Sequence, residues 1–286
     1  MPHLAGRCVA RAWGCDRDVM LPSSRYLQRI STPRHLILTT LAAATGLAAS
    51  LVLLPAPAVA VSTGPRADAG GSRFQIPADA DQLIVVDSAT YHPARPGYVA
   101  TLRTYARAGR RSRWRTVFGA WHAEIGYGHL RDVRREGDGS TPTGVFGIGA
   151  TMYGTKPDPG GLHYAYHRLV CGDWWDEDPY SLRYNRFVHV LCGVTPVFAS
   201  WSEALWTETR AYRYFAVVQF NANPITAGSD APGSGIFLHS WVGGATAGCV
   251  ALPEVRLLAV LRWLRPSAHP VIEIGTEHEV DPAPPR

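Results

Sequence analysis

The sequence predicts a mainly β fold with about two short helices, and three observations support this. Most apolar runs after the N-terminal segment have the length of strands, as in Leu83–Asp87 and Tyr214–Phe220. Gly, Pro, Asn and Asp separate these runs, which is typical of hairpin turns. An apolar stripe with helical spacing occurs in Pro253–Leu264, and a second helix is expected over Phe198–Tyr212.

Residues 1–60 predict an export signal rather than a folded domain. Three arginines precede the apolar stretch Leu36–Leu54, and Ala58-x-Ala60 offers small residues to a signal peptidase. We expect cleavage after Ala60; as an alternative, the stretch is long enough to remain as a membrane anchor. Met20 is a second candidate start, which would leave residues 1–19 untranslated. The mature protein is therefore expected to be secreted or membrane-anchored.

After a short linker over residues 61–74, residues 75–275 predict one domain, followed by a flexible tail over 276–286. Strands are expected because apolar or alternating segments lie between turn-forming residues. In chain order, the expected strands are Leu83–Asp87, Tyr98–Ala106, Trp114–Ile125, Val145–Ile148, Tyr214–Phe220, the segment ending at His239, and Val271–Ile274.

Residues 152–193 predict a long irregular insert rich in aromatic residues and turn formers. A loop of this length inside a domain is usually functional, so we expect a lid or wall over a cleft. His163 and His167 have a spacing that can bind zinc on a helix, but the segment lacks the interposed Glu and a clear third ligand. We therefore expect ordinary packing histidines rather than a zinc site.

Charge and cysteine content agree with export. The chain has 28 basic and 23 acidic residues, but residues 1–60 hold six arginines and two aspartates, so the remainder has 22 against 21. A nearly neutral domain gives no electrostatic reason to expect a nucleic-acid partner. After residue 60 three cysteines remain, and an odd number suggests one disulfide and one free thiol. We pair Cys171 with Cys192 and leave Cys249 free; a disulfide that includes Cys249 is the alternative.

Residues 233–253 carry the strongest candidate chemistry. His239 ends an apolar run, Cys249 follows ten residues later, and a small-residue hairpin is expected over Val242–Ala245. A cysteine is nucleophilic as thiolate, and an imidazole is the usual proton acceptor. Gly248 allows a sharp turn at which the Gly248 and Cys249 amides can face one cleft and form an oxyanion hole. The alternative is a buried core thiol and an ordinary strand-end histidine.

Three blocks of the sequence resemble the L,D-transpeptidase catalytic domain family (YkuD-like). Residues 233–240 (GSGIFLHS) match the strand that bears the general-base histidine in that family. Residues 246–250 (TAGCV) match its nucleophile signature, and residues 137–146 (GDGSTPTGVF) match its Thr-Pro-x-Gly-x-Phe turn. Together the blocks span nearly the whole of the expected domain. The resemblance implies a compact, sandwich-like β domain in an exported cell-wall protein of the actinobacterial type.

The resemblance also implies a reaction and its residues. Members cleave an amide in a peptidoglycan stem peptide through a cysteine acyl-enzyme and pass the acyl group to an amine. Cys249 would be the nucleophile, His239 the base, Ser240 the residue that orients His239, and Gly248 part of the oxyanion hole. The resemblance implies no metal and no organic cofactor. A carbapenem is expected to acylate Cys249.

Two positions depart from the family pattern. Ala247 stands where a second histidine is usual, and Ala251 stands where an Arg or Asn commonly follows the cysteine. Binding of the substrate is therefore expected to fall to Thr246 and to residues of the aromatic insert. The insert residues expected to bind substrate are Trp174, Trp175, Tyr184 and Asn185.

Two rival functions remain. The same site would act as an L,D-carboxypeptidase if water were the acyl acceptor. Alternatively, the domain would be a cell-wall-binding module that has lost catalysis, as the alanine at position 247 suggests.

Overall fold

The computed structural model describes residues 73–88 and 98–280. Within these residues strands dominate, and the single α-helix is α1 (Glu254–Trp263). The mainly β fold predicted from the sequence is therefore confirmed. The expected export segment and the alternative start at Met20 lie outside the described residues. In the part of the chain that is described, no helix is both long enough and apolar enough to cross a membrane.

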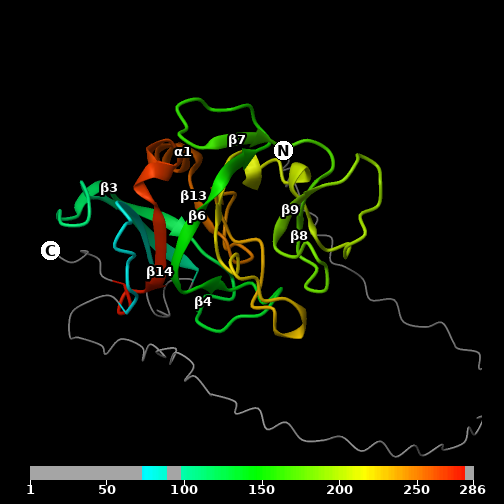
Figure 1. Cartoon of the computed structure of the whole chain (residues 1–286), viewed down its shortest axis with the longest axis horizontal. Coiled ribbons are helices and arrows are strands. Elements are labelled where there is room, and N and C mark those ends of the chain that lie inside the picture. Colours follow the sequence, from blue (N-terminus) through cyan, green and yellow to red (C-terminus); the bar gives the residue numbers. More distant parts are fainter. Residues whose placement is uncertain (1–72, 89–97, 281–286) are drawn as a thin grey trace, which may run out of the picture. The chain divides into compact units, whose positions relative to one another are not determined.

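One large sheet contains nine strands (Figure 1). In spatial order its strands are β11 (Phe215–Val218), β12 (Phe237–Ser240), β13 (Val250–Leu252), β3 (Arg115–Glu124), β2 (Val99–Ala106), β1 (Gln82–Ser88), β14 (Val271–Thr276), β6 (Gly144–Gly154) and β7 (Ala165–Arg168). Strand β11 also pairs with β6, with Phe215 opposite Tyr153. Because the first strand thus reaches the eighth, the sheet closes on itself, and β7 remains as an edge strand that pairs with β6 alone.

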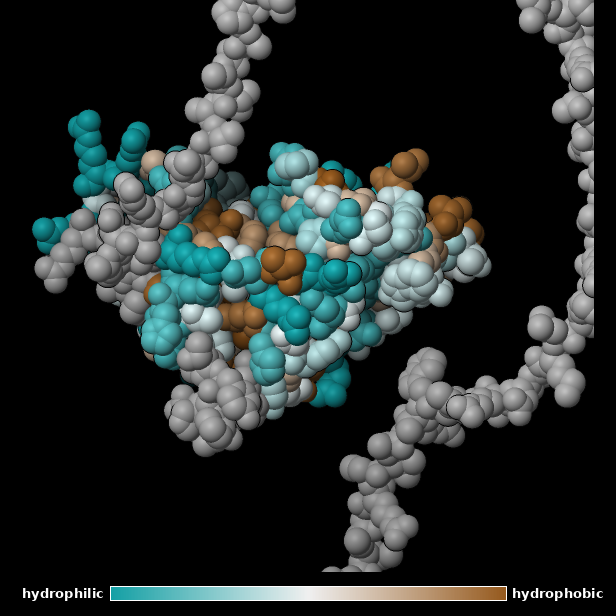
Figure 2. Space-filling model, turned by 90° about the horizontal axis from the view of Figure 1, so that it is seen from below, coloured by the Kyte–Doolittle hydropathy of each residue, from teal (hydrophilic) through white to brown (hydrophobic). Residues whose placement is uncertain are grey.

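Apolar residues that alternate along these strands meet inside the closed sheet. Ile84 and Val86 of β1, Leu102 of β2 and Ile272 of β14 belong to one buried cluster. Helix α1 covers part of the sheet and contributes an apolar face of Leu257, Val260 and Leu261 to the same cluster. On the face shown in Figure 2, hydrophobic residues form separate patches among hydrophilic ones, as expected when most apolar side chains are internal.

The aromatic insert is not the structureless loop that the sequence suggests. It contributes β7 to the large sheet, and its strands β8 (Asp173–Asp176) and β9 (Arg186–His189) join β10 (Glu203–Ala204) in a small sheet of their own. Cys171 and Cys192 form a disulfide that connects the two ends of the β8–β9 segment. A two-stranded sheet of β4 (Leu130–Arg131) and β5 (Thr141–Pro142) lies elsewhere in the chain.

The second expected helix, Phe198–Tyr212, is wrong. This segment contains β10 and two 3-10 turns, η1 (Leu205–Thr207) and η2 (Ala211–Arg213). Tertiary contacts override the weak helical preference, because β10 pairs with β8 and Leu205 is fully buried in a cluster with Trp175 and Phe237. Two further 3-10 turns are η3 (Gly228–Asp230) and η4 (Pro266–Ala268).

The folded domain also extends past both expected boundaries. Phe74, assigned to the linker, packs against the buried cluster that contains Val280, a residue assigned to the tail. Arg73 forms an ion pair with Glu279, which joins the same two segments. Residues 73–74 and 276–280 are therefore part of the domain, whereas residues 61–72 and 281–286 lie outside the described residues.

The expected hairpin between His239 and Cys249 is wrong in its direction. Strands β12 and β13 pair in parallel, with His239 opposite Ala251. Parallel strands start at the same end of a sheet, so residues 241–249 must run back along the strand before β13 begins. Gly243 and Gly244 turn this connection with φ of 107° and 74°, and Thr246 then forms a bridge to Gly126 beyond β3.

Candidate active site

Cys249 lies directly before β13, with its sulfur held between two backbone groups. The Phe237 amide donates a hydrogen bond to Sγ at 3.3 Å, and the thiol donates to the Gly235 carbonyl at 3.3 Å. The residue is 7% exposed. Burial raises the pKa of the Cys249 thiol, and the Glu203 carboxylate raises it further, whereas the Phe237 amide opposes the rise. The resting sulfur is therefore a protonated thiol.

His239 comes from the neighbouring strand, β12, and is also buried. Its Nδ1 lies 2.9 Å from the carbonyl oxygen of Ser240. A carbonyl accepts only, so we assign the ring proton to Nδ1, and Nε2 is then the nitrogen that can accept the thiol proton. The backbone of Ala211 also acts on the imidazole and, like that of Ser240, opposes the lowering of its pKa. Burial lowers the pKa of His239 to about 4, so the imidazole is neutral near pH 7.

His239 and Cys249 line one cavity of about 190 Å³. The other lining residues are Glu203, Glu208, Ala211, Tyr212, Trp241, Val242, Gly244, Ala245, Thr246, Ala247 and Ala251. No hydrogen bond joins the imidazole to the thiol in the described residues, because each is bonded to a backbone carbonyl. For proton transfer, the S–H must turn from Gly235 toward the imidazole.

The turn that carries the sulfur is braced by Thr246. Its Oγ1 accepts a hydrogen bond from the Gly248 amide at 3.1 Å and donates one to the Cys249 carbonyl at 2.7 Å. The Gly248 amide, expected to serve in an oxyanion hole, is thus bonded within the turn. The Cys249 amide is therefore the backbone donor that we expect to serve an oxyanion.

The segment that contains Thr141 of β5 supports the same turn through hydrogen bonds. Thr141 Oγ1 donates to the Gly248 carbonyl at 2.8 Å and accepts from the Gly126 amide at 2.8 Å. Gly248 has a φ of 134°, and a Cβ on it would lie 2.8 Å from the Ser140 carbonyl oxygen. Only glycine fits this close approach, which explains why it precedes the cysteine.

The sequence of the region that contains this site matches a known protein family. The model of the L,D-transpeptidase catalytic domain, YkuD, matches residues 81–274. The chain belongs to this family. The searches of curated proteins and of solved structures found no match. In this L,D-transpeptidase domain, the matched region contains the cavity with Cys249 and His239.

In this L,D-transpeptidase domain, Ser240 contacts His239 through its backbone carbonyl and not through its side chain. Its carbonyl bonds the imidazole, whereas its buried hydroxyl oxygen has no hydrogen-bond partner among the described residues. An unpaired buried hydroxyl is costly, so the contact that matters for the imidazole comes from the backbone. An alanine at position 240 would retain this carbonyl contact.

Glu203 is a residue of the cavity that the sequence did not indicate. One of its carboxylate oxygens accepts a hydrogen bond from the Tyr212 hydroxyl at 2.6 Å, and the Tyr212 ring packs edge-on against His239. Burial raises the pKa of Glu203 to about 7. No local signal reveals this residue, because it belongs to a segment that was expected to be helical.

The four insert residues expected to bind substrate do not line this cavity. Trp175 is buried and packs edge-on against Phe237, with a ring-centroid distance of 5.1 Å. Its Nε1 and the Gly235 amide both donate to Asn185 Oδ1, at 3.0 and 3.1 Å. The Asn185 amide thus connects the insert to the segment that carries the sulfur's backbone partners.

Tyr184 and Trp174 also make contacts inside the protein. Tyr184 is buried, and its hydroxyl donates to Glu136, while Trp174 packs against Phe198 and Trp206. Their packing supports a structural role for the insert, which positions the segment next to Cys249. A direct contact of these residues with substrate stays a prediction.

Proposed function

We propose that this protein is an exported L,D-transpeptidase that acts on peptidoglycan stem peptides through an acyl-enzyme on Cys249. The observation that carries the proposal is the free thiol of Cys249 in one cavity with the neutral imidazole of His239. Membership of the L,D-transpeptidase family supports the reaction class and the substrate. The N-terminal sequence supports export to the cell wall, by a cleaved signal or a retained anchor.

The first half-reaction forms the acyl-enzyme. His239 Nε2 accepts the proton of the Cys249 thiol, and the sulfur attacks the carbonyl carbon of the L,D amide. The Cys249 amide donates to the oxygen of the tetrahedral intermediate. When the C–N bond breaks, the imidazolium returns its proton to the departing amine, which leaves as a D-amino acid. A thioester and a neutral imidazole remain.

The second half-reaction transfers the acyl group. An amine of a neighbouring stem attacks the thioester carbon, and His239 accepts one proton from the attacking nitrogen. The C–S bond breaks and a new amide forms, which joins the two stems. The proton on His239 then returns to the sulfur, so the enzyme regains its starting state.

Incubation with a stem tetrapeptide and a D-amino acid acceptor tests the proposal. We expect mass spectrometry to detect exchange of the terminal residue of the tetrapeptide, with no product from the Cys249→Ser variant. Release of a tripeptide alone would show that water is the acceptor and that the protein is an L,D-carboxypeptidase. If the intact tetrapeptide bound without turnover, the domain would be a wall-binding module.

A further inference from the structure

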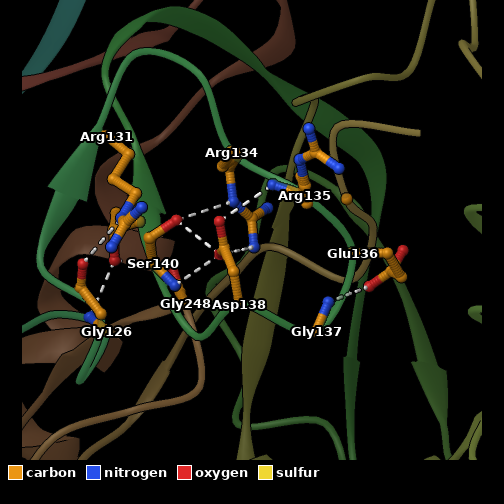
Figure 3. A network of polar contacts seen from close by, with 12 residues as sticks. Gly126, Arg131, Arg134, Arg135, Glu136, Gly137, Asp138, Ser140 and Gly248 are labelled. Carbon is orange, nitrogen blue, oxygen red and sulfur yellow. Dashed lines mark hydrogen bonds and ion pairs between the residues drawn. The ribbon is translucent and has the colours of Figure 1, made fainter. Parts of the chain in front are cut away.

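A buried arginine lies beside the Cys249 turn and is not explained by the mechanism above. Arg134 comes from the loop between β4 and β5, and its side chain is only 3% exposed. Its Nε donates to Ser140 Oγ at 3.3 Å, and its Nη2 lies 3.6 Å from Asp138 Oδ1 (Figure 3). The guanidinium also lies over the ring of Phe220, at 5.2 Å from the centroid. A buried arginine held in this way requires a reason beyond stability.

The hydrogen bonds of Arg134 are incomplete. Its Nη1 atom is buried and has no hydrogen-bond partner among the described residues. Arginine usually uses its five N–H groups to satisfy several acceptors at once, so a buried donor without one is costly. The positive charge of Arg134 is therefore only partly compensated by acceptors and acts on the charged groups around it.

Two glycines allow the guanidinium to approach the backbone at the nucleophile. A Cβ on Gly248 would lie 3.3 Å from Nη2, and a Cβ on Gly233 would lie 2.5 Å from Nη1. Both glycines have positive φ, of 134° and 122°. Because Gly248 directly precedes Cys249, the cation is packed against the turn that carries the sulfur, as Figure 3 shows for Arg134 and Gly248.

The charges around Cys249 show why a cation is needed there. The carboxylates of Glu203 and Glu177 both disfavour a thiolate at Cys249, whereas Arg134 favours it. On its other side, Arg134 faces Asp138, Glu136 and the Tyr184 hydroxyl. Glu136 accepts hydrogen bonds from Tyr184 and Ser234, which stabilise its negative charge. The imidazole of His239 is neutral and adds no charge.

We propose that Arg134 is a positioning residue that holds a positive charge behind the Cys249 turn and so stabilises the thiolate against the nearby carboxylates. This inference rests on the proposed role of Cys249 as nucleophile. Arg134 touches no substrate in this account. Arg134 acts on the reaction through the sulfur. A neutral side chain of equal length would not supply its positive charge.

The pH dependence of Cys249 alkylation by iodoacetamide tests this directly and requires no substrate turnover. We expect Arg134→Met to raise the midpoint of the alkylation profile by about one pH unit, which is a tenfold lower rate on the rising limb. Arg134→Lys keeps the charge and should stay within about threefold of the wild type. Arg135→Met is the matched control, since Arg135 is the neighbouring exposed arginine, and it should leave the profile unchanged.

A second variant keeps the test decisive if Arg134→Met does not fold. Asp138→Asn removes the carboxylate that is paired with Arg134, so it should lower the midpoint. The asparagine oxygen can still accept from Ser140, while the acceptor of the Arg135 amide is lost. A folded Arg134→Met protein with an unchanged midpoint, or an Asp138→Asn protein without the downward shift, would overturn the inference. If the shifts occur but no acyl transfer is found, the proposed function fails while the inference about Arg134 stands.

Discussion

The Nδ1 atom of His239 lies 2.9 Å from the carbonyl oxygen of Ser240, the next residue in the chain. The imidazole is therefore held in one tautomer by a backbone acceptor and not by a carboxylate. This arrangement keeps a neutral base in a buried position, because burial lowers the pKa of His239 to about 4. A neutral imidazole can accept the Cys249 proton over the whole range above that pH.

A substitution at position 239 should slow the acylation of Cys249, whereas removal of the Ser240 hydroxyl should leave the acylation rate unchanged. His239→Gln removes the base, so we expect acylation of Cys249 to slow by about a hundredfold or more. Ser240→Ala keeps the carbonyl and removes only an unpaired buried hydroxyl, so its rate should match the wild type. Stopped-flow measurement of acylation checks both variants. A large loss in Ser240→Ala would show that the hydroxyl, and not the carbonyl, orients the imidazole.

The hydrogen bonds of Thr246 predict a loss of stability when its hydroxyl is removed. Thr246→Val leaves the Gly248 amide and the Cys249 carbonyl without their shared partner, at a cost of about 2 kcal/mol in the free energy of unfolding. Thr246→Ser retains the hydroxyl and serves as the control. Chemical denaturation measures both variants, and equal stability of the two would contradict the role of the hydroxyl.

The pKa shifts of His239 and Glu203 predict two pH dependences of stability that oppose each other. For His239, whose pKa falls from 6.5 to about 4 on folding, stability is present above pH 6.5 and is lost as the pH falls toward 4. For Glu203, whose pKa rises from 4.5 to about 7, stability is present below pH 4.5 and is lost as the pH rises toward 7. Between pH 4.5 and 6.5 the two contributions largely cancel.

Glu203→Gln should expose the contribution of His239. Relative to the wild type, the free energy of unfolding of this variant should fall by up to about 1.4 kcal/mol per pH unit from pH 6.5 to 4.5. Glu208→Gln is the control, because Glu208 is an exposed carboxylate at the same cavity. Urea titrations across this range provide the measurement. If the free energies of unfolding of Glu203→Gln and the wild type changed equally with pH, the opposing contributions of His239 and Glu203 would be refuted.

The disulfide of Cys171 and Cys192 should contribute to stability but not to the reactivity of Cys249. Its 21-residue separation predicts a loss of about 3 kcal/mol when both cysteines are replaced by serine. Thermal unfolding measures this loss, and iodoacetamide labelling measures the reactivity of Cys249. A changed labelling rate in the folded double variant would show that the disulfide also positions the nucleophile.

Local sequence patterns predicted most of the strands and helix α1. Val271–Ile274 lies within β14, Tyr98–Ala106 closely matches β2, and Pro253–Leu264 closely matches α1. These elements have strong periodicity and clear turn residues at their ends, so their local preference agrees with the fold. The pairing of β12 with β13 could not be predicted in the same way. The Gly243-Gly244 pair indicates a turn, but the direction in which the chain returns depends on contacts with β3.

The sequence predicted only those residues of the candidate site that lie within one short segment. His239 and Cys249 are ten residues apart, and the structure brings both to one cavity. Glu203 and Arg134 come from distant segments, and their influence on the sulfur arises only when folding buries them beside it. A buried charge of this kind has no local sequence signature, because its partners are set by tertiary contacts.

The central claim is that Cys249 is an activated thiol in an acyl-transfer site. The most direct test is the intact mass of the purified protein before and after incubation with a carbapenem. We predict one adduct, mapped to Cys249 by peptide mass spectrometry and missing in Cys249→Ser. A folded wild-type protein that gains no mass, or an adduct at another residue, would contradict the claim.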